Sequence, residues 1–118
     1  MRVDGGAGDD VIRGGCGNDY LTGHTGNDTI TGRDGDDTIL GRGGDDVLYG
    51  NDGHDQIFGN FGDDRIYGQD GDDTLEGGFD NDRIWGGEGA DTILGNEGDD
   101  TLRGESDDDT IRGGDGND

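Results

Sequence analysis

Thirteen aspartates recur through this chain of 118 residues at intervals of nine. They are Asp10, Asp19, Asp28, Asp37, Asp46, Asp55, Asp64, Asp73, Asp82, Asp91, Asp100, Asp109 and Asp118. Carboxylates are the ligands that hard divalent cations prefer, and a pair of carboxylates can also cleave a glycosidic bond. Because the interval never changes, all thirteen hold the same place in a repeated unit. Their chemistry therefore depends on how the units stack.

The repeated unit has nine residues, and Gly32–Leu40 is one copy. Glycine stands at place one, usually glycine at place four, aspartate at place six, and Ile or Leu at place eight. No residue is inserted or deleted. The chain thus divides into lead residues 1–4 and one array over residues 5–118, with twelve complete units and a partial thirteenth. Self-similarity at a fixed period predicts a repeat architecture.

The glycines separate turns from strands. All 30 fall at places one to four, where they mark backbone that needs a positive φ or a close approach. Places seven to nine, such as Val47-Leu48-Tyr49, are rich in β-branched and aromatic residues. Two glycines in every nine residues argue against a helix. Each unit is therefore predicted to hold a six-residue turn and a three-residue strand.

An all-β fold follows, in which two units form one coil of a flat solenoid with two parallel sheets. Odd units build one sheet and even units the other, so neighbouring strands lie eighteen residues apart. The predicted core is the place-eight column: Ile12, Leu21, Ile30, Ile39, Leu48, Ile57, Ile66, Leu75, Ile84, Ile93, Leu102 and Ile111. This single column is narrow, and the stacked aspartates repel one another.

Composition excludes several classes of partner. The formal net charge is −23, and all eight basic residues are arginines, so nucleic acid and anionic membrane surfaces are not expected partners. No apolar run is long enough to span a bilayer, and we expect no N-terminal signal peptide. Only 24% of the residues are hydrophobic, which is typical of disorder, but the strict period argues against it. The single cysteine, Cys16, excludes an internal disulfide.

Stacking places each aspartate beside the one eighteen residues on, which predicts up to eleven shared cation sites. Eleven divalent ions would carry +22 against the formal −23. Ca²⁺ fits best, since it takes six to eight carboxylate and carbonyl oxygens in forgiving geometry, whereas Mg²⁺ demands strict octahedral geometry. Zinc has only His24, His54 and Cys16 available. We expect carbonyls of the place-four glycines to complete the sites: Gly8, Gly17, Gly26, Gly35, Gly44, Gly53, Gly62, Gly71, Gly89 and Gly98.

The unit resembles the nonapeptide repeat G-G-x-G-x-D-x-U-x of the RTX (repeats-in-toxin, hemolysin-type calcium-binding) proteins. Residues 5–13, Gly-Gly-Ala-Gly-Asp-Asp-Val-Ile-Arg, match it at every defined place. The resemblance implies a parallel β-roll with Ca²⁺ between successive turns, held by the place-six aspartates and turn carbonyls. It also implies a secreted, extracellular protein that a type I system exports unfolded and that folds where calcium is abundant.

Two departures from the motif bear on the sites. Place two is often not glycine, and carries His24, Arg33, Arg42, Asn51, Asn60, Gln69, Asn96 and Glu105. If this place needs a positive φ, the asparagines should accommodate it best. At place four, Asp80 and Asp107 replace glycine. Because aspartate tolerates left-handed backbone less well than glycine, the sites beside them are expected to be the weakest.

Place nine predicts an outward stripe of Tyr49, Tyr67 and Trp85 on one sheet. Such a stripe can support the sheet by same-face stacking. Alternatively it can dock an intramolecular partner domain, a glycan or a second copy of the chain. The acidic residues at places three and five are interpreted as solvating surface or as groups behind the metal ligands, and His54 and Ala90 at place five as neutral substitutions.

The sequence favours a non-enzymatic calcium-binding module whose folding depends on Ca²⁺. The alternative is an accessory repeat region of a larger extracellular enzyme, toxin or adhesin. Catalysis is not expected within these residues, because Ser106 is the only serine, lysine is absent and the two histidines lie thirty residues apart. A flat solenoid also offers no obvious pocket for chemistry by two carboxylates.

Overall fold

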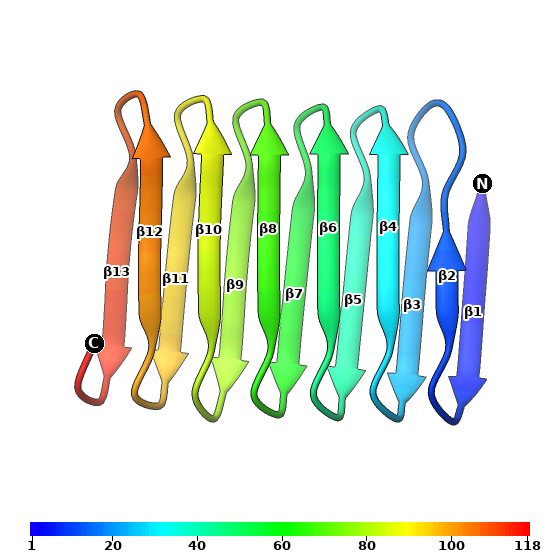
Figure 1. Cartoon of the computed structure of the whole chain (residues 1–118), viewed down its shortest axis with the longest axis horizontal. Coiled ribbons are helices and arrows are strands. Elements are labelled where there is room, and N and C mark those ends of the chain that lie inside the picture. The colour runs from blue at the N-terminus through cyan, green and yellow to red at the C-terminus, as the bar shows by residue number, and fades with distance from the viewer.

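The computed structural model describes residues 1–118 as two parallel sheets lying face to face (Figure 1). The strands are β1 (Arg2–Ala7), β2 (Val11–Arg13), β3 (Tyr20–Thr25), β4 (Thr29–Asp34), β5 (Thr38–Gly43), β6 (Val47–Asp52), β7 (Gln56–Phe61), β8 (Arg65–Asp70), β9 (Thr74–Phe79), β10 (Arg83–Glu88), β11 (Thr92–Glu97), β12 (Thr101–Ser106) and β13 (Thr110–Asp115). No helix of the structure is long and apolar enough to cross a membrane.

The topology is that of a coil with two strands per turn. The seven odd-numbered strands form one sheet, called sheet A here, and the six even-numbered strands form sheet B. Each strand pairs in parallel with the strand two places on, and partners such as Leu48 and Ile66 lie eighteen residues apart. Odd and even strands run in opposite directions, so the chain crosses between the sheets at every turn (Figure 1). The predicted two-sheet parallel solenoid, with two repeats per coil, is confirmed.

The strands are longer than expected. Most have six residues and cover places seven to nine and then places one to three of the next unit, so the prediction of three-residue strands and six-residue turns was wrong. Only β2 has three residues. The longer strand puts two inward positions on each strand, places eight and one. Because place one faces inward, a side chain there would enter the space between the sheets, which glycine leaves open.

A left-handed backbone at place two lets residues other than glycine remain in the strand. His24, Arg33 and Glu105 adopt φ values of 83, 95 and 80° there. Asn51 and Asn60 have the same geometry, at 83 and 84°. Asparagine therefore shows no structural distinction from the charged residues at this place. The long strands and their ladder hydrogen bonds outweigh the intrinsic preference of each residue.

The hydrophobic core is one column between the sheets. Ten side chains are buried in it: Ile12, Leu21, Ile30, Ile39, Leu48, Ile57, Ile66, Leu75, Ile84 and Ile93. Leu102 and Val3 are partly buried against this column, whereas Ile111 in the last strand is 45% exposed. The predicted core is thus confirmed in ten of its twelve residues, while Leu102 is partly buried and Ile111 is exposed. Val3 belongs to β1, which begins inside the four lead residues.

Candidate metal centre

The place-six aspartates lie in two columns, one along each edge of the roll where the chain turns. Within a column, each aspartate donates its backbone N–H to Oδ1 of the aspartate eighteen residues on. All eleven predicted pairs make this bond, at 2.7–3.1 Å. The stacking that the sequence predicted is therefore present, and each inner aspartate contacts two others.

The second carboxylate oxygen has no protein donor. Oδ2 is buried and without a hydrogen-bond partner at Asp10, Asp28, Asp37, Asp46, Asp55, Asp64, Asp73, Asp82, Asp91 and Asp100. A buried polar oxygen without a partner is unfavourable, and ten of them in one small protein is far more than chance would leave. The fold therefore buries a series of carboxylate oxygen atoms that need a positively charged or hydrogen-bond-donating partner.

The place-one glycines lie directly beside these oxygens. A Cβ atom built on Gly5 would stand 2.6 Å from Oδ2 of Asp10 and 3.0 Å from the carbonyl oxygen of Gly23. In each of the remaining units, Oδ2 of the place-six aspartate likewise lies against the place-one glycine, and in most units the carbonyl of a place-one glycine of the next coil lies there too. Glycine thus keeps open a small space that a carboxylate oxygen and a backbone carbonyl oxygen both face.

Burial perturbs the acidity of the columns. It raises the pKa of Asp64 to about 8, of Asp73 and Asp82 to about 7, and of Asp46 and Asp55 to about 6. The backbone donor at Oδ1 opposes this rise, while the charges of neighbouring aspartates add to it. Burial raises the pKa in the same way at Asp28, Asp37, Asp91 and Asp100. Negative charge in the columns is therefore unfavourable without a counterion.

Asp19 shows how a positively charged partner changes the pKa of a place-six carboxyl. Its Oδ1 lies 2.6 Å from the N-terminal ammonium of Met1, and its Oδ2 accepts the N–H of Gly15 at 2.7 Å. The ammonium hydrogen bond, followed by the Gly15 donor, lowers the pKa of this carboxyl. Asp19, the first aspartate of its column, is thus compensated by a cation within the chain, and its pKa moves in the opposite direction from that of Asp37, its neighbour in the column.

The donor set fits a hard cation that accepts backbone ligands. No three side chains of His, Cys, Asp or Glu come together to form a site alone. An ion in the columns would therefore combine carboxylates with carbonyl oxygens, which is a donor set that suits Ca²⁺.

The place-four glycines form columns of their own. All have positive φ, and the nearest atoms to Gly26 and Gly53 belong to the carbonyl groups of Gly8 and Gly35, one coil earlier. The structure thus stacks the place-four glycines of successive coils on one another, and it positions the place-six carboxylates beside the place-one glycines. Asp80 and Asp107 also adopt positive φ, at 75 and 79°.

Place five has a role that the sequence analysis missed. Its side-chain oxygen accepts the backbone N–H of the place-five residue one coil later, as from Asn81 to Asp63 at 2.9 Å. His54 does the same through Nδ1, which accepts the N–H of Asp72 at 2.9 Å. His54 is thus no neutral substitution, because it supplies an acceptor where aspartate or asparagine usually does. The recurrence of Asp and Asn at place five was the available signal.

The predicted outer stripe is present on sheet B. Tyr49 stacks on Tyr67 with ring centroids 4.9 Å apart, and Tyr67 stacks on Trp85 at 4.7 Å. A second stack, which the sequence analysis missed, joins Phe61 and Phe79 on sheet A at 4.9 Å. Both phenylalanines stand at place three, where no apolar pattern recurs, so the sequence carried no periodic signal for them.

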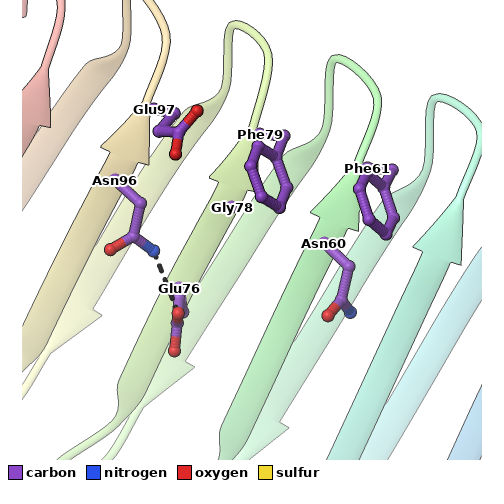
Figure 2. A pocket seen from close by; sticks show the side chains of 7 residues that line it. All are labelled: Asn60, Phe61, Glu76, Gly78, Phe79, Asn96 and Glu97. Carbon is purple, nitrogen blue, oxygen red and sulfur yellow. Dashed lines mark hydrogen bonds between the residues drawn. The ribbon is translucent and has the colours of Figure 1, made fainter.

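Figure 2 shows the Phe61–Phe79 stack beside a hollow of about 400 Å³ on the outer face of sheet A. Gly78 forms its floor, and Asn96 donates to Oε1 of Glu76 at 3.0 Å across one side. Residues of places nine, two and three line this one hollow, so side chains at these three places share the outer face of a sheet. No residue of the aspartate columns lines it.

Comparison with known families gives one result. The family described as RTX calcium-binding nonapeptide repeat (4 copies) matches residues 2–30, 14–48, 22–57, 31–66, 49–84 and 85–118, which together span nearly the whole chain. Comparison with curated proteins gave no match. The unit of glycines, place-six aspartate and place-eight aliphatic residue, the eighteen-residue coil and the family match agree: the chain belongs to the family of RTX calcium-binding nonapeptide repeats.

Proposed function

We propose that this chain is a calcium-binding module whose two aspartate columns hold Ca²⁺ and whose folding depends on it. The observation that carries the proposal is the row of buried Oδ2 atoms without a partner. Each lies beside a place-one glycine, and in most units a backbone carbonyl of the next coil lies there too. Calcium supplies the positive charge that these oxygens lack.

The proposed ligands are the thirteen place-six aspartates together with turn carbonyls. The carbonyls of the place-one glycines lie nearest to the carboxylates, and those of the place-four glycines remain candidates for the rest of the coordination shell. In eleven of the thirteen aspartates a backbone N–H at Oδ1 fixes the orientation of the carboxylate, so that Oδ2 is left for the ion. The place-one glycine keeps the space clear.

Cooperative binding follows from the stacking. Each inner aspartate belongs to two neighbouring pairs, so one ion holds in place a carboxylate that the next ion also uses. Up to about eleven ions could bind, each adding about 2.7 kcal/mol to stability at a hundredfold excess over its Kd. Kd values of extracellular calcium modules are typically ~10⁻⁴–10⁻³ M, which would leave the chain unfolded in the cytosol and folded outside.

The biological setting proposed here is that of a secreted protein, in which the roll is a non-catalytic part. RTX repeats are calcium-binding β-rolls and not a catalytic fold. An accessory region of a larger extracellular enzyme, toxin or adhesin remains the alternative, and the outer aromatic stripe would then be a docking face.

Far-ultraviolet circular dichroism during a calcium titration, with magnesium as the control, tests the proposal. We expect a cooperative change from coil to β structure with calcium alone, and calorimetry should count several ions per chain. A spectrum that is already β in chelator at neutral pH, and that calcium does not change, would overturn the proposal.

A further inference from the structure

Sheet B carries two charged rows and one aromatic row on its outer face. Arg65 and Arg83 are register partners at place seven, near one end of β8 and β10. At the other end of these strands, at place three, Asp70 and Glu88 are register partners. Tyr67 and Trp85 lie between the two rows, at place nine. The face thus runs from basic through aromatic to acidic along each strand.

Neither charged row is neutralised within the chain. The ion pairs of the structure are those of the Met1 ammonium and of His24, and no arginine takes part in one, although the chain has 31 acidic residues. Arg65 and Asp70 are five residues apart on an extended strand, about 16 Å, which is too far for contact. Like charges directly opposite each other on neighbouring strands are destabilising. An external partner of opposite charge would therefore stabilise both rows.

We propose that the partner is a second copy of this chain, which packs its own sheet B face to face across a twofold axis parallel to the long axis of the roll. Such an axis reverses the strand direction, so place seven of one copy meets place three of the other. Arg65 then faces Asp70 of the partner subunit, and Arg83 faces Glu88 of the partner subunit. The contact is isologous, so every ion pair occurs twice.

The aromatic stripe fits the centre of this contact. Place nine lies next to the middle of the six-residue strand, so reversal brings the Tyr49–Tyr67–Trp85 rows of the two copies side by side. All three rings are half-buried in one copy and gain cover from the other. The roll extends 33 × 26 Å across this face, which can approach the ~800 Å² per partner of a standard stable interface. Aromatic residues at the centre and charges at the rim match the usual anatomy of such interfaces.

The dimer requires the folded roll but not the identity of the ion that folds it. Calcium in the columns would also cancel most of the formal charge of −23, which otherwise keeps two copies apart. Association is therefore expected in calcium and not in chelator.

A charge swap tests the arrangement by sedimentation equilibrium in calcium. The wild-type chain should give a species of twice its 12.3 kDa that dissociates on dilution. Arg65→Glu with Arg83→Glu should be monomeric, and so should Asp70→Arg with Glu88→Arg. An equal mixture of the two variants should restore the dimer, because each supplies the charge that the other has lost. Phe61→Thr with Phe79→Thr, which removes a comparable stack from sheet A, should leave the dimer intact.

Circular dichroism of the same samples separates the two proposals. A chain that folds with calcium but stays monomeric overturns the dimer and leaves the calcium proposal standing, as does a mixture of folded variants that fails to associate. A folded chain that calcium does not affect overturns the calcium proposal alone. If a charge-reversed variant does not fold, the neutral pairs Arg65→Gln with Arg83→Gln and Asp70→Asn with Glu88→Asn take its place, and unchanged dimerisation by both pairs would refute the ion pairs.

Discussion

Replacing Asp64 with asparagine should change stability in opposite directions with and without calcium. Asp64 stands in the middle of its column, where its Oδ1 accepts the N–H of Asp46 at 2.8 Å and its own N–H binds Asp82 at 2.9 Å. Asparagine keeps the Oδ1 acceptor and nearly the same shape. What changes is Oδ2, a buried oxygen without a partner, which becomes an uncharged amide nitrogen.

Without calcium, the variant should be the more stable protein. The pKa of Asp64 is raised to about 8, so ionising it in the folded chain is unfavourable at neutral pH, whereas the unfolded chain ionises it freely. Asparagine removes this penalty but must bury an amide. We expect a net gain of about 1–3 kcal/mol, the usual range for relieving an unsatisfied buried polar group.

With calcium, the variant should be the less stable protein. Asp64 belongs to the pairs with Asp46 and with Asp82, so two ions lose a carboxylate ligand. At a hundredfold excess of calcium over Kd, the loss of two sites corresponds to about 5 kcal/mol. Calorimetry should count about two fewer ions per chain, and the binding curve should be less cooperative.

The assay is chemical denaturation followed by circular dichroism, in calcium and in chelator with an osmolyte that keeps the folded fraction measurable. Asp63→Asn is the matched control. Asp63 is the exposed neighbour at place five, where asparagine occurs naturally at Asn27 and Asn81 and accepts the same bond. The control should change neither curve appreciably. A loss of stability of equal size in both conditions, with an unchanged ion count, would refute the assignment of the column as the calcium site.

Three further results are expected. In chelator, the stability of the fold should be greatest below about pH 4 and should fall as pH rises through 6 to 8, because five place-six carboxyls have folded pKa values of about 6 to 8 against 3.8 in the unfolded chain. Denaturation curves that show stability rising over this range would contradict the burial argument. Gly50→Ala should prevent calcium-dependent folding, because its Cβ would collide with Oδ2 of Asp55, whereas Gly15→Ala, whose Cβ comes no nearer than 4.0 Å to any carboxylate, should fold in the same titration. His54→Ala should lower the free energy of unfolding by about 0.5–1.5 kcal/mol through loss of its bond to the N–H of Asp72, while His54→Asp should not, and equal stability of the two variants would show that the bond contributes nothing.

The periodic part of the fold could be read directly from the sequence. Some places of the unit carry the same kind of residue in every copy, such as the aspartate at the place of Asp28 and the aliphatic residue at the place of Ile30. Only a structure with the same period can give all copies of such a residue the same surroundings. The period and the glycine positions therefore gave the two sheets, the eighteen-residue register and the eleven aspartate pairs. The same reasoning cannot give strand length, because it depends on places two and three, where Arg33 and Glu105 show no β-forming pattern.

The features that the sequence analysis did not predict depend on contacts between coils, and residue type alone does not reveal these contacts. The bond from Asn81 to Asp63 is invisible in a single unit, since it joins the same place in successive coils. The stack of Phe61 and Phe79 occupies a variable place in two units only. The space at place one could not be foreseen either, because it requires knowing that a six-residue strand turns Gly5 inward against Asp10.

The constant register has a kinetic consequence. Every strand pairs with a segment eighteen residues away and never with a distant part of the chain, so no step of folding waits for a long loop to close. Folding can start at any coil and advance by one strand at a time, as in other arrays whose units contact only their neighbours. A chain that enters a calcium-rich space end first could therefore acquire its final structure progressively, with the portion already folded serving as the template for the strand that follows.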